Sequence, residues 1–310
     1  MPKKGAVPGK RSLDKLKEGA RFLLRRWTGY FLFFPTVLVI AVLVLLPVLE
    51  AIRWAFTDLN LMKPETEYIG FSNFAEMRRD ATFWVALKNS ILLTTVVIVL
   101  QYILGLGLAV ALKQKVPGIG IFRSVVMASW VIPVITTVVM FKFMAQPNYG
   151  FFNIILQHLG LGQYATYWFG SLYGAFPMIV IMHLWRNVPF YGIALLAAMQ
   201  AIPNELYEAA EIDGANSWQR FRYITLPGVR YMSMVMITIH VIWTFNNFDF
   251  IFLSTGGGPV DATQVLPVYI YIQSWHHFAM GYASAIGIVM LILLLLFFFV
   301  YIRINKEREV

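Results

Sequence analysis

Six long apolar runs alternate with shorter polar segments along the chain. They occupy about 30–48, 90–112, 122–144, 172–199, 232–253 and 282–303. Each run has about 20 residues or more, the helix length that crosses the hydrocarbon core of a bilayer. The pattern therefore predicts an all-α, polytopic membrane protein with six transmembrane helices. Its spanning domain would cover 30–303, with tails at 1–29 and 304–310.

Composition agrees with a membrane protein and excludes several kinds of chemistry. Hydrophobic residues make up 59% of the 310 residues and charged residues only 13%, against roughly a quarter in ordinary globular proteins. The chain has no cysteine, which excludes disulfides, iron–sulfur clusters, thiolate zinc sites and cysteine nucleophiles. No metalloprotease or serine-hydrolase spacing occurs. We therefore expect no catalytic residue and no metal site in this chain.

Basic residues are concentrated on one predicted side of the membrane. With the N-terminus inside, the cytoplasmic segments are 1–29, 113–123, 200–231 and 303–310, and they contain 18 of the 25 Lys and Arg residues. Such an excess in cytoplasmic loops sets the orientation of membrane proteins. We therefore expect both termini, including the basic tail 1–29, in the cytoplasm. The net charge of +9 follows from this placement beside the lipid bilayer, and no nucleic-acid partner is expected.

Two other segments are expected on the opposite side. Residues 145–171 contain no Lys, Arg, Asp or Glu but seven Tyr, Trp and Phe side chains. Aromatic residues concentrate at membrane interfaces, so this segment is expected along the outer surface. Residues 49–89 are mixed in charge and are expected to form a small external cap or an interfacial helix.

The cytoplasmic segment 201–227 is predicted to form two short helices. Asn204 is a good N-cap residue, and Gly214 suits the left-handed position after a helix. Ser217 would cap the second helix, and Pro227 would end it. The small side chains of Ala209 and Ala210 would let another body approach one face of the first helix closely, with the charges of Glu208 and Glu211 on neighbouring faces. These features leave two interpretations open, an amphipathic connector on the membrane and an element that docks a partner.

The same segment resembles a known family motif. Glu208-Ala209-Ala210, Gly214 and the Ile-x-Leu-Pro sequence at 224–227 match the spacing E-A-A-x3-G-x9-I-x-L-P. This is the EAA loop of permease subunits of bacterial ATP-binding-cassette importers. The resemblance implies a type I importer permease (MetI-like) fold in the bacterial inner membrane. It also implies a coupling helix that docks in an ATPase subunit, with Glu208, Ala209, Ala210, Asp213 and Gly214 at the contact.

Shorter motifs at 68–74, 80–84, 117–123, 189–192, 255–259 and 281–285 resemble carbohydrate-uptake permeases, the relatives of maltose and glycerol-3-phosphate importer subunits. This resemblance implies a carbohydrate, polyol or glycoside as substrate. It also implies a second permease subunit, usually a paralogue, an ATPase dimer and an external solute-binding protein. ATP and Mg²⁺ would be held by the partner ATPase, and this chain would need no cofactor.

Polar side chains inside the apolar runs indicate a cavity. His240, Thr244 and Asn247 are spaced i, i+4 and i+7, which places them on one helix face. Buried polar groups in membranes usually face a bundle interior or a watery cavity. Trp130 and Trp243 would offer flat surfaces to a sugar ring. Pro133 and Pro189 would bend their helices.

By the family resemblance, the positions that contact sugar fall on Trp130, Val134, Asn187, Phe190, His240, Thr244 and Asn247. Three of these, Val134, His240 and Thr244, differ in residue type from the maltose-type permease. A structural role remains the alternative for each residue. Asn247 would then bond between helices, Trp130 would pack in the core, and Arg186 would pair with Asp249.

Two other functions compete with the importer. In a stand-alone secondary transporter or channel, His183, Arg186, His240 and Asp249 would form a proton relay. Such a protein has no need of the 201–227 loop. A membrane enzyme would use the same polar groups, and the lack of a nucleophile–base pair counts against it.

Overall fold

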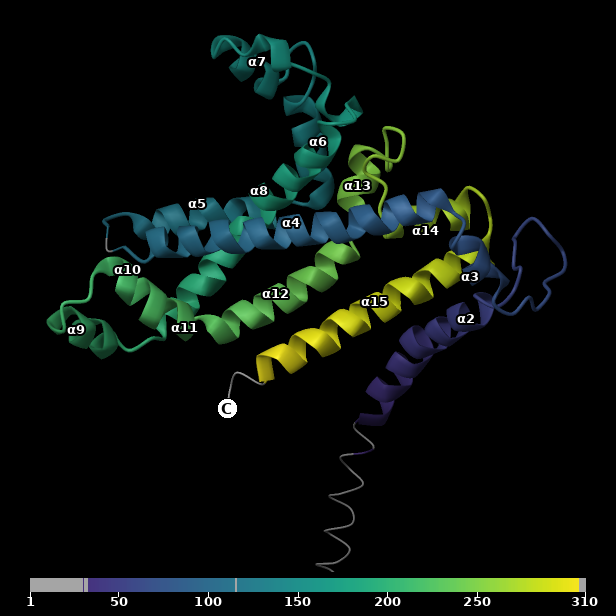
Figure 1. Ribbon diagram of the computed structural model, residues 1–310, viewed down its shortest axis with the longest axis horizontal. Coiled ribbons are helices and arrows are strands. Elements are labelled where there is room, and N and C mark those ends of the chain that lie inside the picture. Colours follow the sequence, from purple (N-terminus) through teal and green to yellow (C-terminus); the bar gives the residue numbers. More distant parts are fainter. Residues whose placement is uncertain (1–29, 31–32, 115, 307–310) are drawn as a thin grey trace, which may run out of the picture.

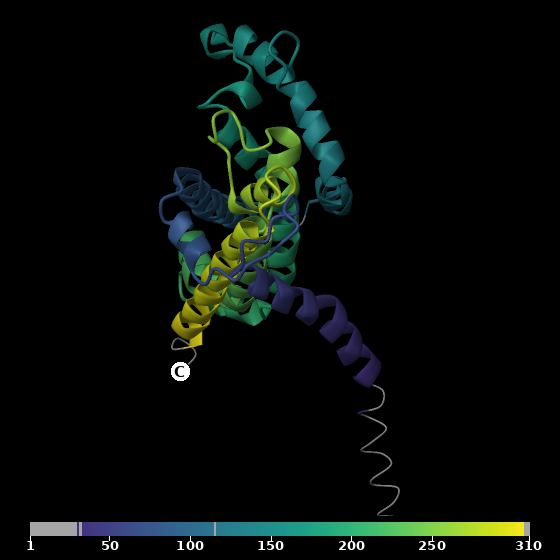
Figure 2. The same cartoon turned by 90° about the vertical axis from the view of Figure 1, so that its right-hand side faces the viewer.

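A computed structural model describes residues 30, 33–114 and 116–306 (Figures 1 and 2). The basic tail 1–29 and the end of the second tail, 307–310, lie outside the described residues. Within the described part the regular secondary structure is helical, apart from one isolated bridge between Thr57 and Tyr68.

Four helices are long and apolar enough to cross a membrane, and the number is six if each of two bent helix pairs counts as one span. The straight ones are 33–54 (containing the π-helix η1, Ala41–Leu45, and α2, Leu46–Trp54), α4 (Ala81–Leu112), α8 (Ala175–Gln200) and α15 (Met280–Lys306). The all-α, multi-span architecture expected from the sequence is therefore confirmed.

The third apolar run is bent rather than straight. It forms α5 (Ile119–Val131) and α6 (Val134–Met144), which meet at 94°. The cause is Pro133, since the residue before a proline is driven out of the helical region. Ile132 accordingly has φ −61° and ψ 131°. The bend expected at Pro133 is confirmed, whereas Pro189 lies inside the single helix α8.

The fifth apolar run is interrupted as well. Helix α12 (Arg230–Phe245) ends before Asn246, and α13 (Asp249–Ser254) begins three residues later. The backbone N–H of Phe250 donates to Asn247 Oδ1 at 3.2 Å, which helps α13 to start. The sequence pattern also missed α14 (Leu266–Trp275), because its apolar stretch is shorter than a span.

Helices α4 and α8 lie against each other through a pair of glycines. A Cβ atom on Gly105 of α4 would lie 2.4 Å from Cβ of Tyr191, and one on Gly192 of α8 would lie 2.6 Å from Cδ2 of Leu108. Only glycine allows backbones to approach this closely, the usual role of small residues between membrane helices. This crossing places the polar residues of α8 in the middle of the bundle.

One end of the bundle is closed by a hydrogen-bonded cap around α3 (Ser72–Met77). Asn73 Nδ2 donates to the carbonyls of Ala55 (2.8 Å) and Thr57 (2.9 Å). The carboxylate of Asp80, which also caps α4, accepts from the hydroxyls of Tyr269 and Tyr282. The 49–89 segment therefore folds as a cap that joins α2, α4, α14 and α15.

The aromatic segment projects from the bundle. Helices α6 and α7 (Phe151–His158) lead away from α4 (Figures 1 and 2), followed by the short turns η2 (Gly162–Tyr164) and η3 (Trp168–Gly170). Asn153 organises this projection, donating to three backbone carbonyls and accepting from Trp168 Nε1 at 2.9 Å.

Candidate functional site

Three helices bring a row of rings together inside the bundle. Trp130 of α5 stacks on Phe190 of α8, with centroids 5.0 Å apart and planes 12° apart. Phe190 in turn lies 5.7 Å from the ring of His240 on α12. His240 also contacts Tyr191 at 4.6 Å and Trp243 at 5.1 Å. The sequence had placed Trp130, Phe190 and His240 at one site, and the structure brings them together.

The polar residues of the predicted site differ in whether they have hydrogen-bond partners within the protein. His240 and Thr244 are buried, one turn apart on α12. His240 Nε2 has no hydrogen-bond partner within the described residues. Asn187 Nδ2 donates to the carbonyl of His183 at 3.0 Å, within its own helix. An unpaired buried nitrogen costs free energy unless a ligand or water satisfies it, so His240 is the polar group most in need of a partner.

Asn247 departs from the expected arrangement. The i, i+4, i+7 spacing assumed one continuous helix, but α12 ends at Phe245. Asn247 therefore lies in the break, where its backbone N–H donates to Thr244 O at 3.1 Å and its Oδ1 accepts from Phe250. The prediction of a shared helix face is confirmed for His240 and Thr244 and is wrong for Asn247.

The expected pairing of Arg186 with Asp249 is also wrong. Arg186 Nε donates to the carbonyl of Ile132 at 3.4 Å, and Asp249 is exposed at the start of α13. The bend at Pro133 leaves that carbonyl without a helical partner, so the guanidinium satisfies it instead. In the described part of the chain, ion pairs join Arg53 to Glu50, Lys63 to Asp58 and Arg220 to Glu211.

The polar groups suggested for a proton relay are not joined by hydrogen bonds in the described residues. The ring of His183 packs against Phe250, 4.4 Å between centroids, and its Nε2 is unpaired. Its backbone carbonyl accepts from Gln101 Nε2 at 3.2 Å, a link between α4 and α8 that no sequence pattern indicated. These residues hold helices together rather than form a continuous chain of donors and acceptors.

A second candidate site lies at the opposite end of the bundle from α3, where α9 (Asn204–Ile212) and α10 (Ser217–Arg220) form a helix–turn–helix (Figure 1). Gly214 has φ +80°, as expected for a left-handed residue after a helix. The N–H of Ala215 donates to Ala210 O at 2.8 Å and that of Gly214 to Glu211 O at 3.1 Å. These bonds end α9 and set the turn between the two helices.

The helix boundaries differ from the sequence prediction. Asn204 is the first residue of α9 and makes no capping bond; Pro203 occupies the N-cap position. Asn216, not Ser217, caps α10 through a reciprocal pair with Gln219 (2.9 and 2.8 Å). The extended backbone of Asn216 (ψ 170°) lets its side chain reach the amide of Gln219.

Pro227 does not end the second helix. A π-helical turn, η4 (Phe221–Thr225), continues α10, and Pro227 lies within α11 (Leu226–Gly228). The helical run therefore extends one residue past Pro227, to Gly228. The chain instead bends by 61° between Gly228 and α12.

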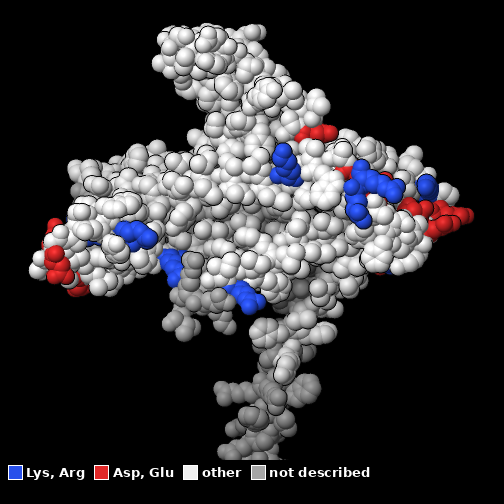
Figure 3. Space-filling model, viewed as in Figure 1, with Lys and Arg blue, Asp and Glu red and all other residues white. Residues whose placement is uncertain are grey.

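The helix–turn–helix presents an unpartnered surface that combines acids with large apolar groups. Glu208, Ala209, Asp213 and Gly214 are exposed, and Ala210 is half-buried. Figure 3 shows acidic side chains gathered over this end of the molecule. The surface also exposes four large apolar side chains, which sequence analysis missed: Leu206, Ile212, Trp218 and Tyr223. Exposed apolar side chains often mark interaction sites. The presence of four large apolar residues in an otherwise polar loop could have indicated such a site from the sequence.

The helix–turn–helix is fixed to the bundle at its base. The ammonium of Lys113, at the end of α4, lies 4.0 Å from the centroid of the Tyr207 ring. The Tyr207 hydroxyl in turn lies 3.0 Å from Thr225 Oγ1. A Cβ on Gly228 would lie 2.4 Å from Ile202 Cδ1, so the connections to α8 and α12 pack tightly. The helix–turn–helix is therefore packed against the ends of α4, α8 and α12.

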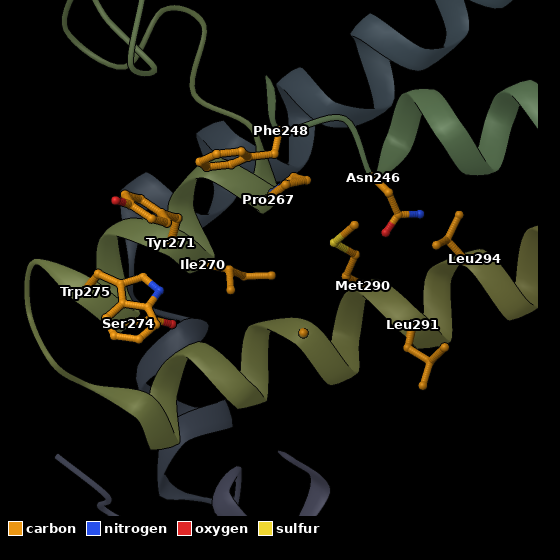
Figure 4. Close-up of a pocket in the computed structure, with 11 residues that line it drawn as sticks. Asn246, Phe248, Pro267, Ile270, Tyr271, Ser274, Trp275, Met290, Leu291 and Leu294 are labelled. Atoms are coloured by element: carbon orange, nitrogen blue, oxygen red, sulfur yellow. The ribbon is translucent and has the colours of Figure 1, made fainter. Parts of the chain in front are cut away.

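A large groove elsewhere in the molecule contains none of the predicted site residues. It has a volume of about 500 Å³ and lies between α14 and α15 (Figure 4), with Asn246, Phe248, Tyr271, Trp275 and Met290 among its lining residues. In the described residues no group of three or more His, Cys, Asp or Glu side chains is placed to hold a metal ion.

Comparison with known proteins identifies the family. Residues 102–309 match the family model described as "binding-protein-dependent transport system inner membrane component". The trehalose/maltose transport system permease protein MalF of Thermococcus litoralis is 33% identical over 281 residues, covering 90% of this chain and 94% of the relative. The diacetylchitobiose uptake system permease protein DasB of Streptomyces coelicolor is 32% identical over 286 residues, covering 90% and 87%.

The fold also has a solved counterpart. A chain in the crystal structure of a bacterial ABC transporter involved in import of the acidic polysaccharide alginate superposes with a TM-score of 0.82 at 22% sequence identity. The match covers 94% of this chain and 99% of that one. At this identity the likeness establishes the shared fold, the type I importer permease fold expected from the EAA motif.

Proposed function

Because the chain belongs to the family of binding-protein-dependent transport system inner membrane components, we propose that it is a membrane-spanning subunit of an ATP-driven importer that carries a carbohydrate or a related polyol or glycoside. The observation that carries the proposal is the exposed helix–turn–helix at Asn204–Arg220. Its turn is set by Gly214, and it is fixed to three spanning helices.

The ATPase contact follows from that surface. Glu208, Ala209, Ala210, Asp213 and Gly214 would face the ATPase, and segment 201–227 would act as the coupling loop. Exposed Ile212 and Trp218 would enter an apolar cleft of the partner. Coupling requires only that the ATPase bind one conformation of the bundle more tightly than the other. ATP and Mg²⁺ would belong to the ATPase dimer, and this chain would itself catalyse nothing.

The substrate class rests on relatives and on the row of rings. Two similar proteins are permeases of a trehalose/maltose transport system and a diacetylchitobiose uptake system. The Trp130–Phe190 stack with buried His240 and Thr244 supplies a flat apolar surface beside polar groups, the combination that pyranose rings require. Asn187 and Asn247 would add amide contacts at the edge.

The assembly would contain more than this chain. A solved relative of the same fold was crystallised with a periplasmic protein bound to an alginate pentasaccharide. An external solute-binding protein would deliver the sugar, and a second permease subunit, usually a paralogue, would complete the pathway. The protein would lie in the bacterial inner membrane, with tails 1–29 and 304–310 in the cytoplasm.

Transport in proteoliposomes tests the proposal. The chain is reconstituted with its co-purified subunits and binding protein, and sugar uptake is measured with ATP inside or with a proton gradient alone. Uptake that requires ATP supports the importer. Uptake driven by the proton gradient without an ATPase subunit supports the secondary transporter and rejects the proposal.

A further inference from the structure

A pocket with mixed apolar and polar lining lies behind the helix–turn–helix, between it and the ends of α4 and α8. Its volume is about 270 Å³. Val110 and Met199, from the last turns of α4 and α8, provide apolar walls. The polar part is formed by Lys113, Gln114, Tyr207, Ser217, Arg220 and Thr225.

The residues that line the pocket include two cations, Lys113 and Arg220, and no carboxylate. Lys113 Nζ lies over the face of Tyr207 and has no carboxylate within 4.0 Å in the described residues. Nearby, Arg123 Nη2 donates to Leu112 O at 2.8 Å, while its Nε is buried without a partner. Glu211 is the opposing carboxylate, 3.1 Å from Arg220 Nη1, and its side chain is 69% exposed. Solvent weakens such an exposed pair, so the net field in the pocket favours an anion.

The wall opposite α4 has an irregular backbone. Phe221 and Thr225, which line the pocket, are the two ends of the π-helical turn η4. Single π turns cost stability and occur frequently at functional sites. Here the turn brings Thr225 Oγ1 to the Tyr207 hydroxyl, so that two hydroxyls join the cations around one space.

The place of the pocket along α4 identifies the chemistry of its ligand. From Ile91 to Leu112, α4 has no charged residue, and the first charged residue after that stretch is Lys113. A cation at the end of a spanning helix lies at the level of lipid headgroups. Basic pockets between spanning helices bind anionic headgroups, and Arg and Lys donors match phosphate oxygens.

We propose that this pocket binds a phosphate group, carried either by the headgroup of an anionic phospholipid or by free phosphate. The bound phosphate bridges Lys113 to the α10 side of the pocket and fixes the helix–turn–helix against α4. This site is distinct from both the row of rings and the docking surface. Phosphate binding here does not depend on the importer function, because binding is measured without transport.

The test uses the purified full-length chain, with whatever subunits co-purify, in a neutral detergent. Thermal unfolding is followed while dihexanoyl phosphatidylglycerol, dihexanoyl phosphatidylcholine or inorganic phosphate is added. We expect the anionic lipid, free phosphate or both to raise the unfolding temperature, and the zwitterionic lipid to have little effect. Lys113→Gln should weaken the apparent affinity about tenfold, the change expected for one lost charge-assisted hydrogen bond.

Two matched variants separate the site from general charge effects. Lys113→Arg keeps the cation and should retain the response. Lys88→Gln removes a cation from the other end of α4 and should respond like the unaltered chain. A response to phosphatidylglycerol alone identifies the lipid headgroup, and a response to phosphate alone identifies the free ion. Equal responses to both lipids, no response to either anion, or an undiminished response in Lys113→Gln overturns the proposal.

Discussion

The indole of Trp130 and the phenyl ring of Phe190 lie nearly parallel, with centroids 5.0 Å apart, although 59 residues separate them in the chain. Helix α5 ends at Val131, one residue after Trp130, so the stack stands just before the bend between α5 and α6 at Pro133. A stacked pair at a change of helix direction is held by two rigid elements, which suits a binding surface.

Trp130→Ala should weaken sugar-dependent uptake while the complex still assembles. Loss of an aromatic contact costs about 0.5–1.5 kcal/mol, which corresponds to a rise of about two- to tenfold in the half-saturating sugar concentration. Uptake in proteoliposomes measures this. Trp185→Ala is the control, since Trp185 packs against Phe141 outside the row of rings. Equal effects of the two substitutions would argue against a sugar contact at Trp130.

Gly214→Val should separate ATP hydrolysis from transport. A Cβ there meets nothing within 4 Å, so the penalty comes from φ +80° alone, about 1–3 kcal/mol for a residue other than glycine. The turn between α9 and α10 would rearrange, and stimulation of ATPase activity by substrate would fall. Gly214→Asn is the matched control, because Asn tolerates the left-handed region. Normal coupled uptake by the Val variant would contradict this role for the turn.

Arg186→Met should destabilise the bend at Pro133. The substitution leaves the half-buried carbonyl of Ile132 without its donor, at a cost of about 0.5–1.5 kcal/mol for one lost hydrogen bond. Thermal unfolding in detergent measures the loss. Asp249→Asn should have little effect, because Asp249 does not pair with Arg186. If the two substitutions destabilise the protein equally, the hydrogen bond from Arg186 to Ile132 is not the important contact.

Gly105→Ala should prevent close packing of α4 on α8. The new Cβ would lie 2.4 Å from Cβ of Tyr191, so a backbone must move, and overpacking of this kind typically costs ~1–3 kcal/mol. Gly107→Ala, two residues along the same helix, meets nothing within 4 Å and should be neutral. The unfolding temperatures of the two variants give the comparison, and a similar loss in both would refute the close crossing at Gly105.

Asp80 should make the α3 end sensitive to acid. Burial acts to raise its pKa, but hydrogen bonds from Tyr269 and Tyr282 and from the amides of Phe83 and Thr82 hold the pKa below the ordinary value of 3.8. The folded state therefore binds the Asp80 proton less tightly than the unfolded state does. Ionised Asp80 stabilises the folded state, and this stabilisation is complete above the ordinary pKa of 3.8. It is lost as the pH falls through the lower pKa of the folded state.

Asp80→Asn should therefore lower the unfolding temperature at pH 7 and flatten its dependence on pH below about 4. Thermal unfolding across a pH series measures both effects. Glu65→Gln, at an exposed position of the same cap, should change neither. A pH profile in Asp80→Asn identical to that of the unaltered chain would show that this carboxylate is not the titrating group.

The sequence determined features that depend on local physics. Runs of about 20 apolar residues need a lipid environment whatever their neighbours, so the all-α spanning architecture was predictable. The left-handed residue at Gly214 was also predictable, because glycine adopts that backbone without a penalty. Family resemblance assigned Trp130, Phe190 and His240 to one sugar site; the structure brings their rings together, and their contact with sugar stays a prediction.

Tertiary structure decided features that depend on groups far apart in the chain. The donor for Ile132 O proved to be Arg186, because the bend at Pro133 places that carbonyl beside α8. No local pattern could place Asn247 in a helix break or join Lys113 to Tyr207. Hydrophobic periodicity predicts which residues are buried. It does not predict which group each buried polar side chain bonds, because that partner comes from another helix. The long helices and the bend at Pro133 therefore followed from the sequence, whereas the break after α12, the polar contacts and the pocket behind the helix–turn–helix followed from packing.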